Sequence, residues 1–124
     1  MYTTGACLDL HERTHRSLLK LLDHCAGFSD DELARELEGF GYPSIRHQLH
    51  HVIGAEQYWV GVLRGVMLVA EDPADMASIK ALRAFRERVA GATVEYLSGA
   101  DDAELNTKRE VVTFGDRKVE LVPA

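Results

Sequence analysis

The chain has 124 residues, of which 46% are hydrophobic and 27% are charged, and its formal net charge is −6. This composition is typical of a globular domain in water, and the length suffices for one domain with one modest core, so we expect residues 1–124 to form a single domain. An acidic chain gains no counterion-release energy from phosphates, which argues against a nucleic-acid partner. No apolar run is long enough to cross a bilayer, so we expect no membrane partner.

The first long helix is predicted over residues 4–26, because side chains of one kind recur there at steps of three and four. Its inward positions are Leu8, His11, His15, Leu18, Leu22 and Cys25. Two of these positions are histidines one helical turn apart, and two interpretations stay open. Either His11 and His15 lie near an end of the bundle and are hydrogen-bonded to neighbours, or they form a metal-competent pair.

Cys7 and Cys25 are the two cysteines of the chain. If both lie on the first helix, the rise of about 1.5 Å per residue separates them by roughly 27 Å. A disulfide needs Cα atoms within about 7 Å, so we expect two reduced thiols. Reduced thiols and the lack of a basic, apolar leader favour the cytoplasm.

A second long helix is predicted from Ser44, a candidate N-cap, to about Gly65. Its predicted core face consists of Ile45, Leu49, Val52, Trp59, Leu63 and Val66. Glu56 falls within this apolar series. A carboxylate there requires water, a charged or polar partner, or a function, because an unpaired buried charge is costly.

Three histidines lie on this second helix. His47 and His51 are four residues apart on one flank, a spacing that can chelate a metal. His50 lies on the opposite side and is predicted to face solvent. A compact connection containing the capping-box pattern of Ser29 and Glu32 predicts that the first two long helices pack antiparallel. That orientation would separate the two histidine pairs by roughly 15 Å or more, so we expect them not to share one ion.

The remaining chain is predicted to contain a linker over residues 68–75, an N-cap at Asp75 and a third long helix over residues 76–97. The predicted core positions of that helix are Ile79, Leu82, Phe85, Val89, Thr93 and Tyr96. The tail indicates two short β-like runs, residues 110–114 and 117–122, around a two-residue turn. An isolated hairpin is marginally stable, so it must lean on the helices or on a partner.

The second long helix resembles that of the DinB-like family, damage-inducible proteins with a metal-binding helical bundle. The residues that carry the resemblance are 43–46, 49–56, 59 and 63–65, with support from residues 28–33. The resemblance implies an all-α four-helix bundle of up-down-down-up topology. Three long helices are present, the fourth is missing, and a short β-like tail ends the chain. We therefore expect either a fragment of a longer product or a truncated family member, and favour the fragment.

The resemblance also implies a divalent metal, typically nickel or zinc, held by three histidines. One of them precedes the acidic residue by five positions and corresponds here to His51. The other two belong to the last helix, before which this sequence stops, so His51 is the one predicted metal ligand. Glu56 is expected to orient neighbouring polar groups and not to bind the metal.

Two classes of function are consistent with these observations. The first is a metal-dependent enzyme of the hydrolase or thiol S-transferase type, as the resemblance implies, acting on a small thiol or electrophile. The second is a non-enzymatic helical module that forms a homodimer through its uncovered apolar face, because three amphipathic helices leave one surface unburied. No catalytic residue is assigned from the sequence.

Overall fold

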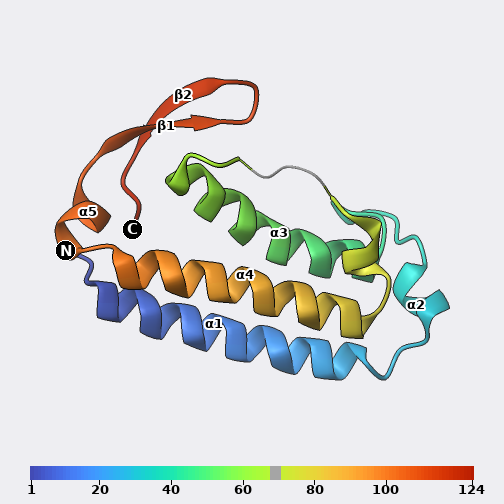
Figure 1. Ribbon diagram of the computed structural model, residues 1–124. Coiled ribbons are helices and arrows are strands. Elements are labelled where there is room, and N and C mark those ends of the chain that lie inside the picture. Colours follow the sequence, from blue (N-terminus) through green and yellow to red (C-terminus); the bar gives the residue numbers. More distant parts are fainter. Residues whose placement is uncertain (68–70) are drawn as a thin grey trace.

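The computed structural model describes residues 1–67 and 71–124. Its three long helices are α1 (Thr4–Cys25), α3 (Ile45–Arg64) and α4 (Ile79–Gly99). Figure 1 shows that α4 packs between α1 and α3, and that α1 runs opposite to the other two. The up-down-down course confirms the predicted all-α bundle and the antiparallel packing of the first two long helices.

The helix starts are set by local caps. The Ser44 hydroxyl accepts a hydrogen bond from the amide of His47, and Ser29 and Glu32 form the predicted capping box at the start of α2 (Asp30–Ala34). These contacts satisfy backbone amides that a helix leaves without partners in its first turn. Because they depend on residues three positions apart, the sequence alone locates them correctly.

The predicted start of the third long helix is wrong. Residues 73–76 form a separate 3₁₀ helix, η1 (Pro73–Met76), which is capped by Asp72 and not by Asp75. The helix α4 begins only after Ser78, whose hydroxyl accepts from the amide of Ala81. Pro73 suits the first turn of η1, where its missing N–H costs nothing. Residues 68–70 of the predicted linker lie outside the described residues.

The tail contains the predicted hairpin, formed by β1 (Arg109–Thr113) and β2 (Arg117–Leu121) in antiparallel pairing. Thr113 faces Arg117 in the register, so the loop has three residues instead of the predicted two. Gly115 and Asp116 in this loop both have positive φ, at 74° and 57°. A short helix that was not predicted, α5 (Asp102–Asn106), precedes β1.

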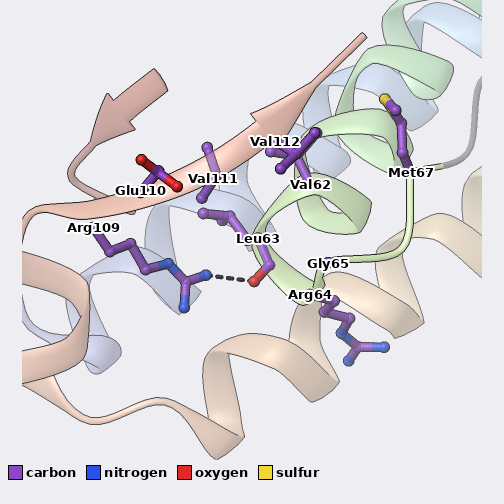
Figure 2. Close-up of a pocket in the computed structure, with 9 residues that line it drawn as sticks. All are labelled: Val62, Leu63, Arg64, Gly65, Met67, Arg109, Glu110, Val111 and Val112. Carbon is purple, nitrogen blue, oxygen red and sulfur yellow. Dashed lines mark hydrogen bonds between the residues drawn. The ribbon is translucent and has the colours of Figure 1, made fainter. Parts of the chain in front are cut away.

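The hairpin is anchored on α3. Figure 2 shows Arg109 reaching the last turn of α3, where its Nη2 donates to the Leu63 carbonyl at 2.5 Å. A guanidinium at this position satisfies a carbonyl that the helix end leaves free and complements the helix dipole. Farther along, the amide of Phe114 donates to the Tyr58 hydroxyl at 2.9 Å. The expectation that the hairpin leans on the helices is therefore confirmed.

The apolar core lies at the end of the bundle where α1 leads into α2. It is formed by Leu22, Cys25, Leu33, Leu49, Ile53, Met76, Leu82, Phe85 and Val89. Both cysteines are free, as predicted, and burial raises the pKa of the Cys25 thiol. None of the helices in the described part of the chain combines the length and apolar character needed to cross a membrane.

The predicted core face of α3 is partly wrong. Leu49 is buried, but Val52, Trp59 and Val66 are 56%, 49% and 58% exposed. The helix is rotated toward α4, which buries Ile53, while β1 packs over Val62 from another side. Periodicity identifies an amphipathic helix, but the position of its neighbours decides which part of a broad apolar surface is covered.

Candidate metal centre

Polar side chains lie next to the apolar core in each of the three long helices, at about the same height of the bundle. They are His11 and His15 in α1, Glu56 in α3 and Thr93 in α4. Because α1 runs antiparallel to α3 and α4, the residues that precede the core in α1 meet those that follow it in the other two helices. The bundle therefore replaces one apolar layer with a polar one.

Glu56 is the centre of this polar layer. Its Oε1 lies 2.7 Å from Nε2 of His11, and its Oε2 lies 2.6 Å from Nε2 of His15. The Thr93 hydroxyl donates to Oε1 at 2.5 Å. An ionised carboxylate only accepts hydrogen bonds, so both imidazole rings direct an N–H toward it. These contacts provide hydrogen-bond donors for a carboxylate whose side chain is only 23% exposed.

The environment keeps Glu56 ionised. Burial by itself raises the pKa of a carboxyl group, but the hydrogen bonds from Thr93, His11 and His15 outweigh it, and the pKa of Glu56 lies below its ordinary value. Its charge is thus compensated by donors from two other helices. This arrangement also links α1 to α3, two helices that α4 otherwise separates.

The same three side chains could hold a metal ion. One ligand atom each from His11, His15 and Glu56 lies within 4.8 Å of the others, and no further group of this kind occurs among residues 1–67 and 71–124. Two imidazoles and one carboxylate form the donor set of several catalytic zinc sites. Both Nε2 protons now point at Glu56, and an ion would take the place of those protons. The donor set therefore fits a divalent metal.

A surface groove of about 640 Å³ runs between α1 and α4 beside this layer. Its lining includes both histidines of the layer and Arg86, with Leu8, Leu19 and other apolar side chains along the walls. The charged groups Glu12 and Arg16 at its edge form an ion pair with each other. The groove thus lies along the histidine side of the polar layer.

His51, the predicted metal ligand, lies elsewhere. Its side chain is exposed and its ring stacks on Tyr42, with 4.1 Å between the ring centroids. Five residues separate it from Glu56, which turns the two side chains about 140° apart on a straight helix. His47 bonds to Ser44 at the start of α3, through its Nδ1. The structure therefore groups Glu56 with His11 and His15, and the role of His51 as a ligand stays a prediction.

The prediction that His50 faces solvent is wrong. The residue is 5% exposed, and its ring stacks on Phe85 of α4 with 4.9 Å between centroids. The rotation of α3 that exposes Val52 brings His50 into the interface with α4. Here the imidazole packs as an aromatic ring at the edge of the apolar core.

The sequence contains a signal for the polar layer. His11, His15 and Glu56 are polar residues within apolar faces, and the first two long helices are predicted to be antiparallel. Placing the two helices side by side at equal height brings these residues together. The sequence-based prediction gives Glu56 only an orienting role, because the family resemblance implies His51 as the ligand.

The comparisons with known proteins agree with the bundle architecture. A family model described as the DinB superfamily matches residues 10–120, which includes most of α1, all of α3 and α4, and nearly all of the hairpin. A search of curated proteins found no match to this chain. Since the family match spans most of the chain, this protein belongs to the DinB superfamily.

Proposed function

We propose that this protein is a metal-dependent enzyme whose divalent ion, nickel or zinc, is bound by His11, His15 and Glu56. The observation that carries the proposal is the convergence of two histidine Nε2 atoms from α1 on the two carboxylate oxygens of one residue of α3. A buried structural ion pair would explain one such contact. Three potential ligands from two helices, beside a groove, favour a binding site.

The surrounding residues would hold the ligands in place. Thr93 fixes Oε1 of Glu56 through a hydrogen bond from α4, so the carboxylate has little freedom to rotate. His11 and His15 lie one turn apart on a long regular helix, which sets the spacing of their rings. Ligands on rigid elements with supporting hydrogen bonds are the arrangement that metal binding requires.

The reaction class follows from the chemistry of such an ion and from the groove. When bound, a divalent ion with nitrogen and oxygen ligands acts as a Lewis acid toward a water or a thiol. This favours hydrolysis or the transfer of a small thiol to an electrophile. The groove between α1 and α4 offers the substrate apolar walls near both histidine rings.

Metal titrations on metal-free protein test the site. Zn²⁺ and Ni²⁺ are added to the wild type and to His15→Ala, Glu56→Gln and His51→Ala, and binding is followed by calorimetry. We expect one ion per chain, and a loss of affinity of more than about tenfold in His15→Ala and Glu56→Gln, because even outer partners of a metal site contribute that much. His24→Ala, which removes an exposed histidine of α1, is the matched control.

The His51 variant separates the two possible sites. If His51→Ala alone abolishes binding, the ion is held at the position that the family resemblance indicates, and the His11–His15–Glu56 assignment fails. If no variant differs from the wild type, neither position is a metal site. If the titrations place the ion at His11, His15 and Glu56, turnover is assayed with the metal-loaded wild type and Glu56→Gln, using a chromogenic ester and a thiol with an aryl electrophile.

A homodimer is the second candidate function. Val52 and Trp59 lie seven residues apart on the same side of α3 and are about half exposed, at 56% and 49%. Two large apolar side chains on one helix face in solvent are typical of a surface that another chain covers. The partner would be a second copy of this chain, packed against α3.

A further inference from the structure

Arg86 and Glu56 contact the two ring nitrogens of His15 from opposite sides. Nη1 of Arg86, on α4, lies 3.2 Å from Nδ1 of His15. On the other side of the ring, Nε2 lies 2.6 Å from Oε2 of Glu56. His15 is buried, with only 6% of the residue exposed, so bulk water does not readily hydrogen-bond to either ring nitrogen.

These two contacts determine which ring nitrogen carries the proton. A guanidinium has only N–H donors and stays charged in proteins, so Nδ1 of His15 must accept from Arg86. A carboxylate only accepts, so Nε2 must donate to Glu56. Both contacts require the same neutral tautomer, with a lone pair on Nδ1 and a proton on Nε2.

A metal ion requires the opposite tautomer of His15. An ion placed near Glu56 would need the lone pair on Nε2, which moves the ring proton to Nδ1. That N–H would then point at the N–H groups of Arg86. Metal-binding histidines normally direct their second ring nitrogen at a carboxylate, a carbonyl or a water, all of which can accept. Arg86 offers no acceptor.

We propose that Arg86 is a positioning residue that holds His15 in the tautomer that does not bind metal, and that it must turn away from His15 when an ion binds. The inference rests on the proposed metal site. Arg86 also lines the α1–α4 groove, so its guanidinium has space to move into. Among the described residues its one side-chain hydrogen bond is the contact with His15, and its buried Nε has no partner. Little therefore holds the guanidinium where it is.

Substitutions at Arg86 test the inference through zinc affinity. In Arg86→Gln the side-chain amide oxygen can accept from Nδ1 of His15, which favours the metal-binding tautomer. We expect Zn²⁺ to bind about tenfold more tightly than to the wild type, the usual size of an outer-partner effect. Arg86→Met removes the opposing donors without adding an acceptor, so it should fall between the two. Competition with a chromophoric chelator measures all three constants.

Arg83→Met is the matched control, since it removes a positive charge from the same helix at a residue that pairs with Asp23 instead of His15. If Arg83→Met strengthens zinc binding as much as Arg86→Gln does, the effect is general electrostatics and the inference fails. It also fails if Arg86→Gln binds zinc no more tightly than the wild type. If neither the wild type nor any variant binds zinc, the proposed function itself fails.

A second measurement needs no metal. The ¹⁵N chemical shifts of the His15 ring report which nitrogen carries the proton in the metal-free protein. We expect an unprotonated Nδ1 and a protonated Nε2 in the wild type, and in metal-free Arg86→Gln we expect Nε2 to stay protonated, because Glu56 still accepts from it. A wild-type ring with its proton on Nδ1 would overturn the inference whatever the zinc affinities are.

Discussion

At the scale of single residues, Glu56 is the centre of the candidate site, and two opposing effects act on its ionisation. Its position within a helical bundle removes much of its hydration, which disfavours the charged form. Donors from α1 and α4 restore that stabilisation and bring its pKa below the ordinary value. A carboxylate compensated in this way stays ionised and stays in one place, which suits a metal ligand.

The contribution of Thr93 to this balance can be measured. Thr93→Val keeps the shape of the side chain and removes the hydroxyl that donates to Glu56. We expect the free energy of unfolding to fall by about 1–2 kcal/mol, because a partly buried charge loses a donor. Urea denaturation of the metal-free protein measures the change. Thr14→Val is the control, since the Thr14 hydroxyl bonds only to a carbonyl of its own helix at an exposed position; an equal loss there would contradict the prediction.

At the scale of elements, the helix starts depend on contacts within a few residues. The capping box of α2 is the clearest case, because Ser29 and Glu32 bond to each other's backbone amides. The backbone and side-chain hydrogen bonds from Ser29 lower the pKa of Glu32 below its ordinary value. Such a group stabilises the folded state above its unfolded pKa, and the contribution is lost as the pH falls through the folded pKa.

The capping box predicts a pH effect confined to α2. In Ser29→Ala the Glu32 carboxyl loses the contribution of the hydroxyl and keeps the backbone amide of residue 29 as a donor, so its pKa should rise only part of the way toward the ordinary glutamate value. An NMR titration of the Glu32 carboxyl in both proteins measures this rise. Ser17→Ala removes an exposed serine hydroxyl from the middle of α1 and should leave the Glu32 titration unchanged. An identical titration curve in Ser29→Ala and wild type would show that the cap does not influence Glu32.

At the scale of the whole molecule, the rotation of α3 exposes an apolar surface. The helix buries Leu49 and Ile53 against the core and presents Val52 and Trp59 to solvent. The polar layer around Glu56 joins α3 to α1, while Arg109 of β1 joins the hairpin to the C-terminal end of α3. The surface with Val52 and Trp59 is the one on which we propose that a second copy of the chain packs.

The dimer proposal is tested by the molar mass in solution. Val52→Gln combined with Trp59→Gln removes the two exposed apolar side chains, so a wild-type dimer should become a monomer. Light scattering after size-exclusion chromatography measures both masses. Val112→Gln makes the same apolar-to-polar replacement at a 44% exposed position of β1, and it should keep the wild-type mass. A wild type that is already monomeric would rule the proposal out.

The three long helices, most of their limits and the terminal hairpin could be predicted from the sequence because their signals are local. A serine cap acts over three residues, and a hairpin turn joins neighbouring strands. The start of α4 could not be placed correctly because Asp72, Asp75 and Ser78 are all plausible caps. In the structure Asp72 caps η1, Met76 packs into the core, and Ser78 caps α4 separately.

The sequence by itself determined that α1 and α3 are amphipathic helices and that His11, His15 and Glu56 interrupt their apolar faces. The tertiary structure alone decided that these residues meet, since 45 positions separate His11 from Glu56. It also decided that His50 is buried while Val52 is exposed. The physical reason is the same in each case. Helical periodicity sets the angles between side chains, whereas the rotation and height of each helix depend on the neighbours against which it packs.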